Sequence, residues 1–189
     1  GDAIVVVPDA MTGAVRRVDH RNGAELWRHS PDGMVFAPPS ATASLGVSLP
    51  VWVDFVGEGS GTVAVESIAA QSGAKTDRFD LFKISYGLGD VPKLPRAAFS
   101  PDGSIIYFGM QTAPGYSLVK ACAARAQGCT GANLSWQTGQ LKDEVVALLP
   151  YAQGSLLAAV GVRNTWVLNI SDGSAVGAPL QPDGALVTM

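Results

Sequence analysis

The sequence has little charge of either sign and no basic excess. Only 15% of its 189 residues are charged, and 13 Lys plus Arg against 16 Asp plus Glu give a formal net charge of −3. A protein that binds nucleic acid through the phosphates carries a basic excess or a basic stripe, so nucleic acid is not expected as a partner. An apolar share of 47% also excludes a disordered chain.

Cysteine occurs only twice, at Cys122 and Cys129. Two cysteines are too few for a zinc site made of cysteine alone, and they lie too far apart for a C-x-x-C redox motif. The segment 123–128 between them can close as a disulfide loop, which the chain-entropy model values at about 2.5 kcal/mol. We therefore predict a Cys122–Cys129 disulfide and an extracytoplasmic location, in a periplasm, in an organelle lumen or outside the cell. Two reduced thiols in a cytosolic loop are the alternative.

The sequence also lacks a long apolar run that is free of helix breakers. Its two long uncharged stretches, residues 34–53 and 145–162, are both interrupted by proline. Because proline disrupts a helix interior, the first stretch is predicted to form strand and loop, and the second a β-hairpin. The chain is therefore not expected to span a membrane, although a membrane complex could be its partner.

What the sequence does contain is a repeated order of strands and turns. Residues 15–19 alternate between apolar and polar side chains, and an Asn-Gly turn then leads into residues 24–27. Alternation that ends in Asn-Gly strongly indicates a β-hairpin. The same order recurs three times in weaker form, and the four turn glycines are Gly23, Gly73, Gly131 and Gly173. Their spacings of 50, 58 and 42 residues match the length of one propeller blade.

Several segments resemble the repeats of known propeller families. Residues 15–28 begin with Val-Arg-Arg-Val-Asp, end with Leu-Trp-Arg, and are similar to the PQQ-like (quinoprotein-type) repeat. Ser-Pro-Asp-Gly at residues 30–33 and 100–103, and Gln-Pro-Asp-Gly at 181–184, resemble a turn of WD-like propellers. The resemblance implies an all-β fold, a β-propeller built of four-stranded antiparallel blades, with about four blades in this chain.

The number of blades leaves two arrangements open. Residues 1–189 either form a single propeller domain or are a fragment of a larger ring. In the four-bladed case a last predicted strand, residues 185–189, would complete the first blade. An edge strand that nothing covers would favour aggregation, so we expect this strand to be paired or covered by a partner.

Candidate residues for chemistry are few. His20 and His29 are the only histidines, and the chain has no G-x-S-x-G motif. His20 is predicted to be a surface residue of a turn, and pairing of the histidines with Asp19 or Asp32 gives no metal-binding pattern. Quinoprotein dehydrogenases have a vicinal Cys-Cys disulfide and calcium-ligating carboxylates, which are not found here, so no quinone cofactor is expected.

Two further patterns have structural explanations. Residues 57–64 contain G-x-G-x-x-A, but the β-branched run within and after it predicts a hairpin loop and not the helix that a dinucleotide site needs. Trp27 and Trp136 fall at matching positions of the repeat and are predicted to pack between neighbouring sheets. Trp52 and Trp166 are expected to pack in the same way, with an aromatic glycan-binding platform as the alternative.

These patterns assign no catalytic, cofactor-binding or metal-ligating residue, so the disulfide of Cys122 and Cys129 is the only predicted site. The sequence therefore favours a non-catalytic interaction module or an accessory subunit of a larger extracytoplasmic assembly, with other protein subunits as partners and no cofactor. The alternatives are a propeller enzyme or a fragment of one, either a hydrolase or an oxidoreductase, and a binder of glycans or small ligands.

Overall fold

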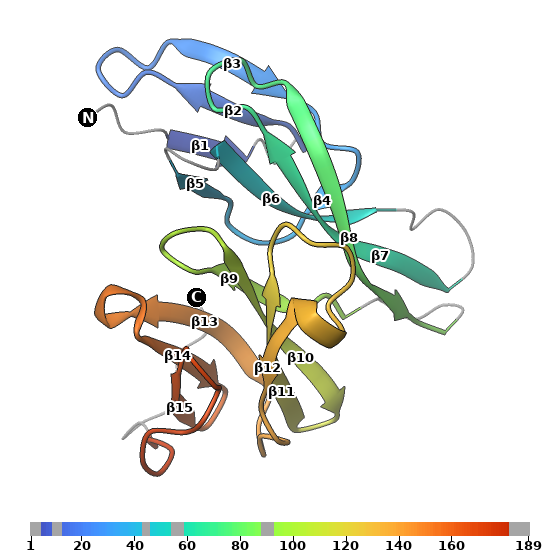
Figure 1. Cartoon of the computed structure of the whole chain (residues 1–189), viewed down its shortest axis with the longest axis vertical. Coiled ribbons are helices and arrows are strands. Elements are labelled where there is room, and N and C mark those ends of the chain that lie inside the picture. Colours follow the sequence, from blue (N-terminus) through green and yellow to red (C-terminus); the bar gives the residue numbers. More distant parts are fainter. Residues whose placement is uncertain (1–4, 9–12, 43–45, 54–58, 88–92, 182–189) are drawn as a thin grey trace. The chain divides into compact units, whose positions relative to one another are not determined.

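A computed structural model describes residues 5–8, 13–42, 46–53, 59–87 and 93–181 (Figure 1). Within these residues every strand pair is antiparallel, the strands form four sheets, and no α-helix occurs. The predicted all-β fold with antiparallel sheets is therefore confirmed.

The chain divides into two compact units. The N-terminal unit comprises Gly1–Pro92 with Arg125–Gly128, and the C-terminal unit comprises Lys93–Ala124 with Cys129–Met189. The expectation of a single domain over residues 1–189 stays a prediction. The predicted last strand, residues 185–189, lies outside the described residues.

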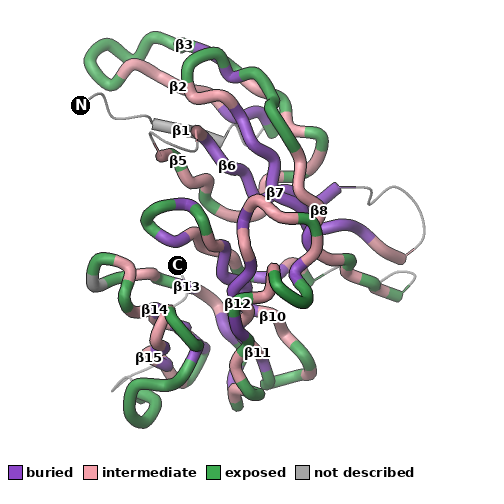
Figure 2. Tube along the Cα trace, in the orientation of Figure 1, coloured by how far each residue is buried: buried purple, intermediate pink, exposed green. Residues whose placement is uncertain are grey.

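The N-terminal unit contains two sheets. The first has the order β1-β2-β3, and the second has the order β4-β6-β7-β8 with β5 paired to β6. β6 and β7 are buried along almost their whole length (Figure 2), as expected for strands of small and apolar residues that are covered on both faces. The strands are β1 (Val5–Pro8), β2 (Val15–Val18), β3 (Glu25–His29), β4 (Met34–Val35), β5 (Ser40–Thr42), β6 (Gly46–Val53), β7 (Ser60–Ile68) and β8 (Lys75–Ser85).

The C-terminal unit also contains two sheets, with the orders β12-β11-β10-β9 and β13-β14-β15. The β-hairpin predicted within residues 145–162 is present as β13 and β14, and β14 alternates between buried and half-buried residues. The elements are β9 (Arg96–Phe99), β10 (Ile105–Ala113), β11 (Tyr116–Ala123), η1 (Gly131–Asn133), β12 (Leu134–Gln137), β13 (Val145–Tyr151), η2 (Ala152–Gly154), β14 (Leu156–Gly161) and β15 (Thr165–Asn169).

Three six-residue turns, at residues 19–24, 69–74 and 169–174, have the same hydrogen bonds. In each turn the N–H of the first residue donates to the carbonyl of the sixth, and the N–H of the fifth, a glycine, donates to the carbonyl of the first. The glycines, Gly23, Gly73 and Gly173, have φ values of 71°, 71° and 72°, which other residues rarely adopt. The same turn, with its glycine, thus recurs in both units.

The fourth predicted turn glycine, Gly131, was assigned wrongly. It belongs to η1 in the connection between β11 and β12, where the two cysteines lie, and it does not have the hydrogen bonds of the other three turns. The additional residues of this connection replace the short turn. The second sheet also departs from the expected four strands, because β5 adds a further strand beside β6.

Each unit contains a tryptophan that packs on a turn glycine of the neighbouring sheet. In the N-terminal unit Trp27 of β3 donates its indole N–H to the carbonyl of Ala70 at 2.8 Å, and a Cβ on Gly73 would lie 2.8 Å from its ring. In the C-terminal unit Trp136 of β12 donates to the carbonyl of Ile170 and lies against Gly173. The prediction that Trp27 and Trp136 pack between neighbouring sheets is confirmed.

Candidate functional site

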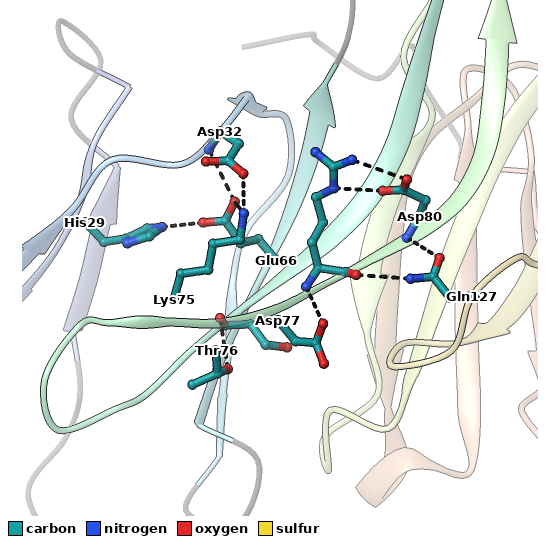
Figure 3. A network of polar contacts seen from close by, with 10 residues as sticks. His29, Asp32, Glu66, Lys75, Thr76, Asp77, Asp80 and Gln127 are labelled. Atoms are coloured by element: carbon teal, nitrogen blue, oxygen red, sulfur yellow. Dashed lines mark hydrogen bonds and ion pairs between the residues drawn. The ribbon is translucent and has the colours of Figure 1, made fainter.

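The N-terminal unit contains a fully buried carboxylate, that of Glu66 near the C-terminal end of the buried strand β7 (Figure 3). His29, at the end of β3, contacts it through Nε2, and the backbone N–H of Asp32 donates to it at 3.2 Å. The Nζ of Lys75, at the start of β8, lies 3.8 Å away. We call His29, Asp32, Glu66 and Lys75 the Glu66 cluster.

The Glu66 cluster is held together by charge and by hydrogen bonds. A buried carboxylate costs several kcal/mol unless it is paired and hydrogen-bonded, and here it has both kinds of partner. Lys75 also forms an ion pair with the Asp32 carboxylate. The hydrogen bond from Lys75, followed by the positive charge of Lys75, Arg78 and His29, holds the pKa of Asp32 below its ordinary value, although slight burial opposes this shift.

The Glu66 cluster has a structural role, which is to connect a turn to the second sheet of the N-terminal unit. Asp32 belongs to the turn at residues 30–33 between β3 and β4, so the cluster joins this turn to β7 and β8 of the second sheet. The contact of His29 with a carboxylate resembles the pair that serves as a general base in enzymes. However, only 10% of the His29 side chain is exposed, and among the described residues no serine, threonine or cysteine hydrogen-bonds to its ring.

A second polar network lies farther along β8 (Figure 3). Arg78 and Asp80 form an ion pair at 2.9 Å. The side-chain amide of Gln127 donates to the backbone carbonyl of Arg78 at 3.2 Å and accepts the backbone N–H of Asp80 at 3.0 Å. The N–H of Gly128 donates to the carbonyl of Asp80 at 2.8 Å. Residues 127 and 128 therefore run beside β8, which is why Arg125–Gly128 belongs to the N-terminal unit.

Cys122 and Cys129 form a disulfide, as predicted, with their Cα atoms 5.3 Å apart. Both cysteines are buried, and the bond closes the connection between β11 and β12. The alternative of two reduced thiols is therefore wrong for this structure. A structural disulfide is typical of proteins from oxidising compartments.

The two histidines have different surroundings. His20 is exposed in the turn at residues 19–24, as predicted. His29 instead meets Glu66, a residue that the sequence analysis did not single out. One signal was present: Glu66 follows Thr62-Val63-Ala64-Val65, where a lone acid in an apolar strand needs a partner if the strand is buried. No group of three or more His, Cys, Asp or Glu residues that could hold a metal ion occurs among the described residues.

The glycine-rich segment does not lead into a helix. Residues 60–68 form β7, which pairs antiparallel with β6 so that Thr62 lies opposite Val53. The hairpin interpretation is therefore confirmed over the described residues, and a dinucleotide site of the helical type is wrong for this segment. Residues 57 and 58 of the motif lie outside the described residues.

The remaining tryptophans are both buried. Trp52 is 5% exposed and contacts the ring of Tyr86 edge to face, and Trp166 is 8% exposed within the core of the C-terminal unit. Core packing, the interpretation preferred from the sequence, is therefore confirmed. Neither side chain offers an exposed aromatic platform for a glycan.

Neither a scan against models of known protein families nor a search of curated proteins finds a match. In the described part of the chain, no helix is long and apolar enough to cross a bilayer.

Proposed function

We propose that this chain is a propeller-type repeat protein that acts without catalysis, as an interaction module or accessory subunit of an extracytoplasmic assembly. The propeller is supported by the three matching turns and by the two tryptophan contacts, which repeat the same sheet-to-sheet packing in each unit. The sheet β9–β12 has four antiparallel strands in sequence order, as one propeller blade does. The disulfide supports the oxidising compartment.

The observation that carries the interaction role is a group of exposed apolar side chains along one strand of the C-terminal unit. Val162 lies just before β15, and Val176 and Leu180 lie in the segment that runs beside it, with 49%, 46% and 60% exposure. This segment is held to β15 by hydrogen bonds from Val176 to Val167 and between Leu180 and Thr165. We call Val162, Val176 and Leu180 the β15 patch.

A pocket of about 420 Å³ is lined in part by the same two chain segments, β15 and the segment that pairs with it. It is lined by Gln140, Leu141, Lys142, Asn164, Trp166 and Pro179, and Pro179 precedes Leu180 of the patch. Exposed apolar side chains next to a hollow are typical of protein-binding surfaces, in which an apolar anchor enters a pocket and polar groups form the rim. The partner that fits is a protein with one or two apolar anchor residues.

The experiment replaces Val176 and Leu180 with Glu and measures co-purification of partner proteins from the extracytoplasmic fraction of the source organism by quantitative mass spectrometry. We expect the wild type to enrich a defined partner. The double variant should recover at least about tenfold less of that partner, because two charges would have to be desolvated at the contact. Leu26→Glu, at a residue 51% exposed in the N-terminal unit, is the matched control and should retain the partner.

The proposal fails if the folded double variant retrieves the same proteins in the same amounts as the wild type. Circular dichroism and thermal unfolding of both variants establish that they are folded. A contact that excludes water over this patch should bury on the order of 1,000 Å² in total.

The second candidate is an enzyme of the hydrolase type, and the contact between His29 and Glu66 is the observation that favours it. In that case His29→Gln should abolish turnover of a substrate while leaving the fold intact. Under the interaction proposal the same variant affects stability and leaves partner binding at the β15 patch unchanged.

A further inference from the structure

The C-terminal unit contains a second pocket that the interaction role does not use. It has a volume of about 270 Å³ and lies beside the Ser-Pro-Asp-Gly turn at residues 100–103. Its other walls are Tyr107 of β10, Gln153 and Gly154 of η2, and Ile170 after β15. All of these residues belong to one unit.

Tyr107 brings an unsatisfied polar atom to this pocket. The residue is fully buried, its ring stacks on Trp136 with the centroids 5.9 Å apart, and its hydroxyl has no hydrogen-bond partner among the described residues. Buried hydroxyls are normally hydrogen-bonded, so the Tyr107 hydroxyl has an unused capacity to accept or donate a hydrogen bond. Burial, and then the negative charge of Asp102, raise the pKa of Tyr107 to about 12, so the hydroxyl keeps its proton at neutral pH.

Asp102 gives the pocket its charge. Hydrogen bonds from Ser100 and Ser104 hold the pKa of Asp102 below its ordinary value, so its carboxylate is ionised at neutral pH. It is the one charged side chain among the lining residues, and within the described part of the chain no basic side chain forms an ion pair with it. The pocket is therefore electrostatically suited to a cation.

Gln153 forms part of the wall in an unusual backbone conformation. Its φ of 55° is the one positive value for a residue other than glycine in the described chain. Such conformations are uncommon and energetically costly for residues other than glycine, so the β13–β14 connection holds Gln153 at this wall. This observation is independent of the charge of Asp102 and of the buried hydroxyl of Tyr107, and it concerns the same pocket.

We propose that this pocket binds a protonated primary amine. An ammonium group placed between Asp102 and Tyr107 would neutralise the carboxylate and donate one hydrogen bond to it and another to the hydroxyl oxygen. The alkyl chain behind the nitrogen would pack on the apolar lining residues Pro101 and Ile170. Both a free alkylamine and the lysine side chain of another protein have this chemistry. The proposal does not depend on the β15 patch.

The test uses the purified chain and n-butylammonium chloride at pH 7, followed in ¹H–¹⁵N NMR spectra through the Gly154 amide and the Trp136 indole N–H. We expect saturable shifts with a Kd of about 1–10 mM, the range for a ligand with so few heavy atoms. Nα-acetyl-lysine methylamide, in a parallel titration, distinguishes a lysine side chain from a small free amine. Butan-1-ol has the same chain without the charge and should shift these signals at least about tenfold less.

The variants separate charge from shape. Asp102→Asn retains an oxygen for the hydrogen bonds of the turn but removes the charge, and it should weaken binding at least about tenfold. Tyr107→Phe removes a hydroxyl without a partner, so it should fold normally and weaken binding about threefold. Asp172→Asn is the matched control, because Asp172 accepts the N–H of Ser174 in an exposed turn of the same unit and is not one of the residues that line the pocket.

Binding that is equal for butylammonium and butanol, or unchanged in Asp102→Asn, would overturn the proposal. So would the absence of saturable shifts up to about 50 mM, several times the expected Kd. Either result leaves the partner experiment on the β15 patch unaffected, because that experiment involves other residues.

Discussion

The turns at residues 30–33 and 100–103 have the same sequence, Ser-Pro-Asp-Gly, but they are stabilised in different ways. The second turn is held by residues close in the sequence. The Ser100 carbonyl accepts the N–H of Gly103, and the Ser100 N–H donates to the carbonyl of Ile105, both at 2.9 Å. The Ser100 hydroxyl donates to the Asp102 carboxylate at 2.5 Å. The first turn is held by side chains that are distant in the sequence, those of Glu66 and Lys75.

This difference shows how little a four-residue motif determines alone. Gly103 adopts a positive φ of 73°, whereas Gly33 does not adopt a positive φ, and a Cβ on Gly33 would collide with the backbone of Trp52. The same glycine is thus required by its conformation in one turn and by lack of space in the other. We expect the two turns to respond differently to mutation, salt and pH.

The largest expected effect is that of Glu66→Leu. This variant leaves the Asp32 N–H and His29 without their buried acceptor and should lower the free energy of unfolding by about 3 kcal/mol or more, as for other broken buried pairs. Urea unfolding at pH 7 measures the change. Glu66→Gln, which retains an acceptor for the Asp32 N–H, should cost less, and a loss below about 1 kcal/mol for Glu66→Leu would show that the first turn does not depend on the Glu66 cluster.

The next effect distinguishes the two serines. Ser100→Ala removes the acceptor of the Ile105 N–H, 3.0 Å away, and the donor to Asp102, so we expect a loss of about 1–2 kcal/mol. Ser30→Ala is the matched control and should change the free energy of unfolding by less than about 0.5 kcal/mol, as is usual for surface substitutions. Equal losses in the two variants, measured by urea unfolding, would mean that both turns depend on local hydrogen bonds.

The smallest effect concerns salt and acid. The pKa values of Asp32 and Asp102 are both lowered in the folded protein, so each carboxylate contributes stability that is present above the ordinary value of 3.8 and is lost as the pH falls through the lowered value. The pKa of Asp32 is lowered mainly by the hydrogen bond from Lys75, whereas the pKa of Asp102 is lowered mainly by the hydrogen bond from the Ser100 hydroxyl.

Raising the salt concentration from 0.05 to 0.5 M at pH 7 should therefore weaken the contribution of Asp32 and leave that of Asp102 nearly unchanged. The measurement compares the unfolding free energies of Asp32→Asn and Asp102→Asn with the wild type at both salt concentrations. The side chain of Asp32 is 48% exposed, so the whole effect should stay below about 1 kcal/mol. A salt dependence that is equal in both variants would contradict the assignment of a charged partner to the first turn alone.

Sequence reasoning succeeded where the interacting residues are close in the chain. The hairpin at Asn22 and Gly23 and the Cys122–Cys129 bond are local, and both are present. The assignment of Gly131 as a fourth turn glycine was wrong, because a longer connection that contains the disulfide replaces the expected short turn.

The contact of His29 with Glu66 could not be predicted, because it joins two sheets. It depends on how β3 lies beside β7, and no sequence pattern within either strand specifies that arrangement. The pocket beside residues 100–103 was missed for the same reason, since Asp102, Tyr107 and Gln153 come from separate elements that only the folded sheets bring together.

The order of strands in the sheets has a consequence for how the chain folds. Nearly every hydrogen-bonded pair of strands among the described residues joins neighbours in the sequence, β4 with β6 being the exception. Each hairpin can therefore form before the following strands have left the ribosome, with short loops to close. The indole contacts of Trp27 and Trp136 join successive sheets and cannot form until the later sheet exists. In each unit we therefore expect this contact to form after the hairpins that it joins.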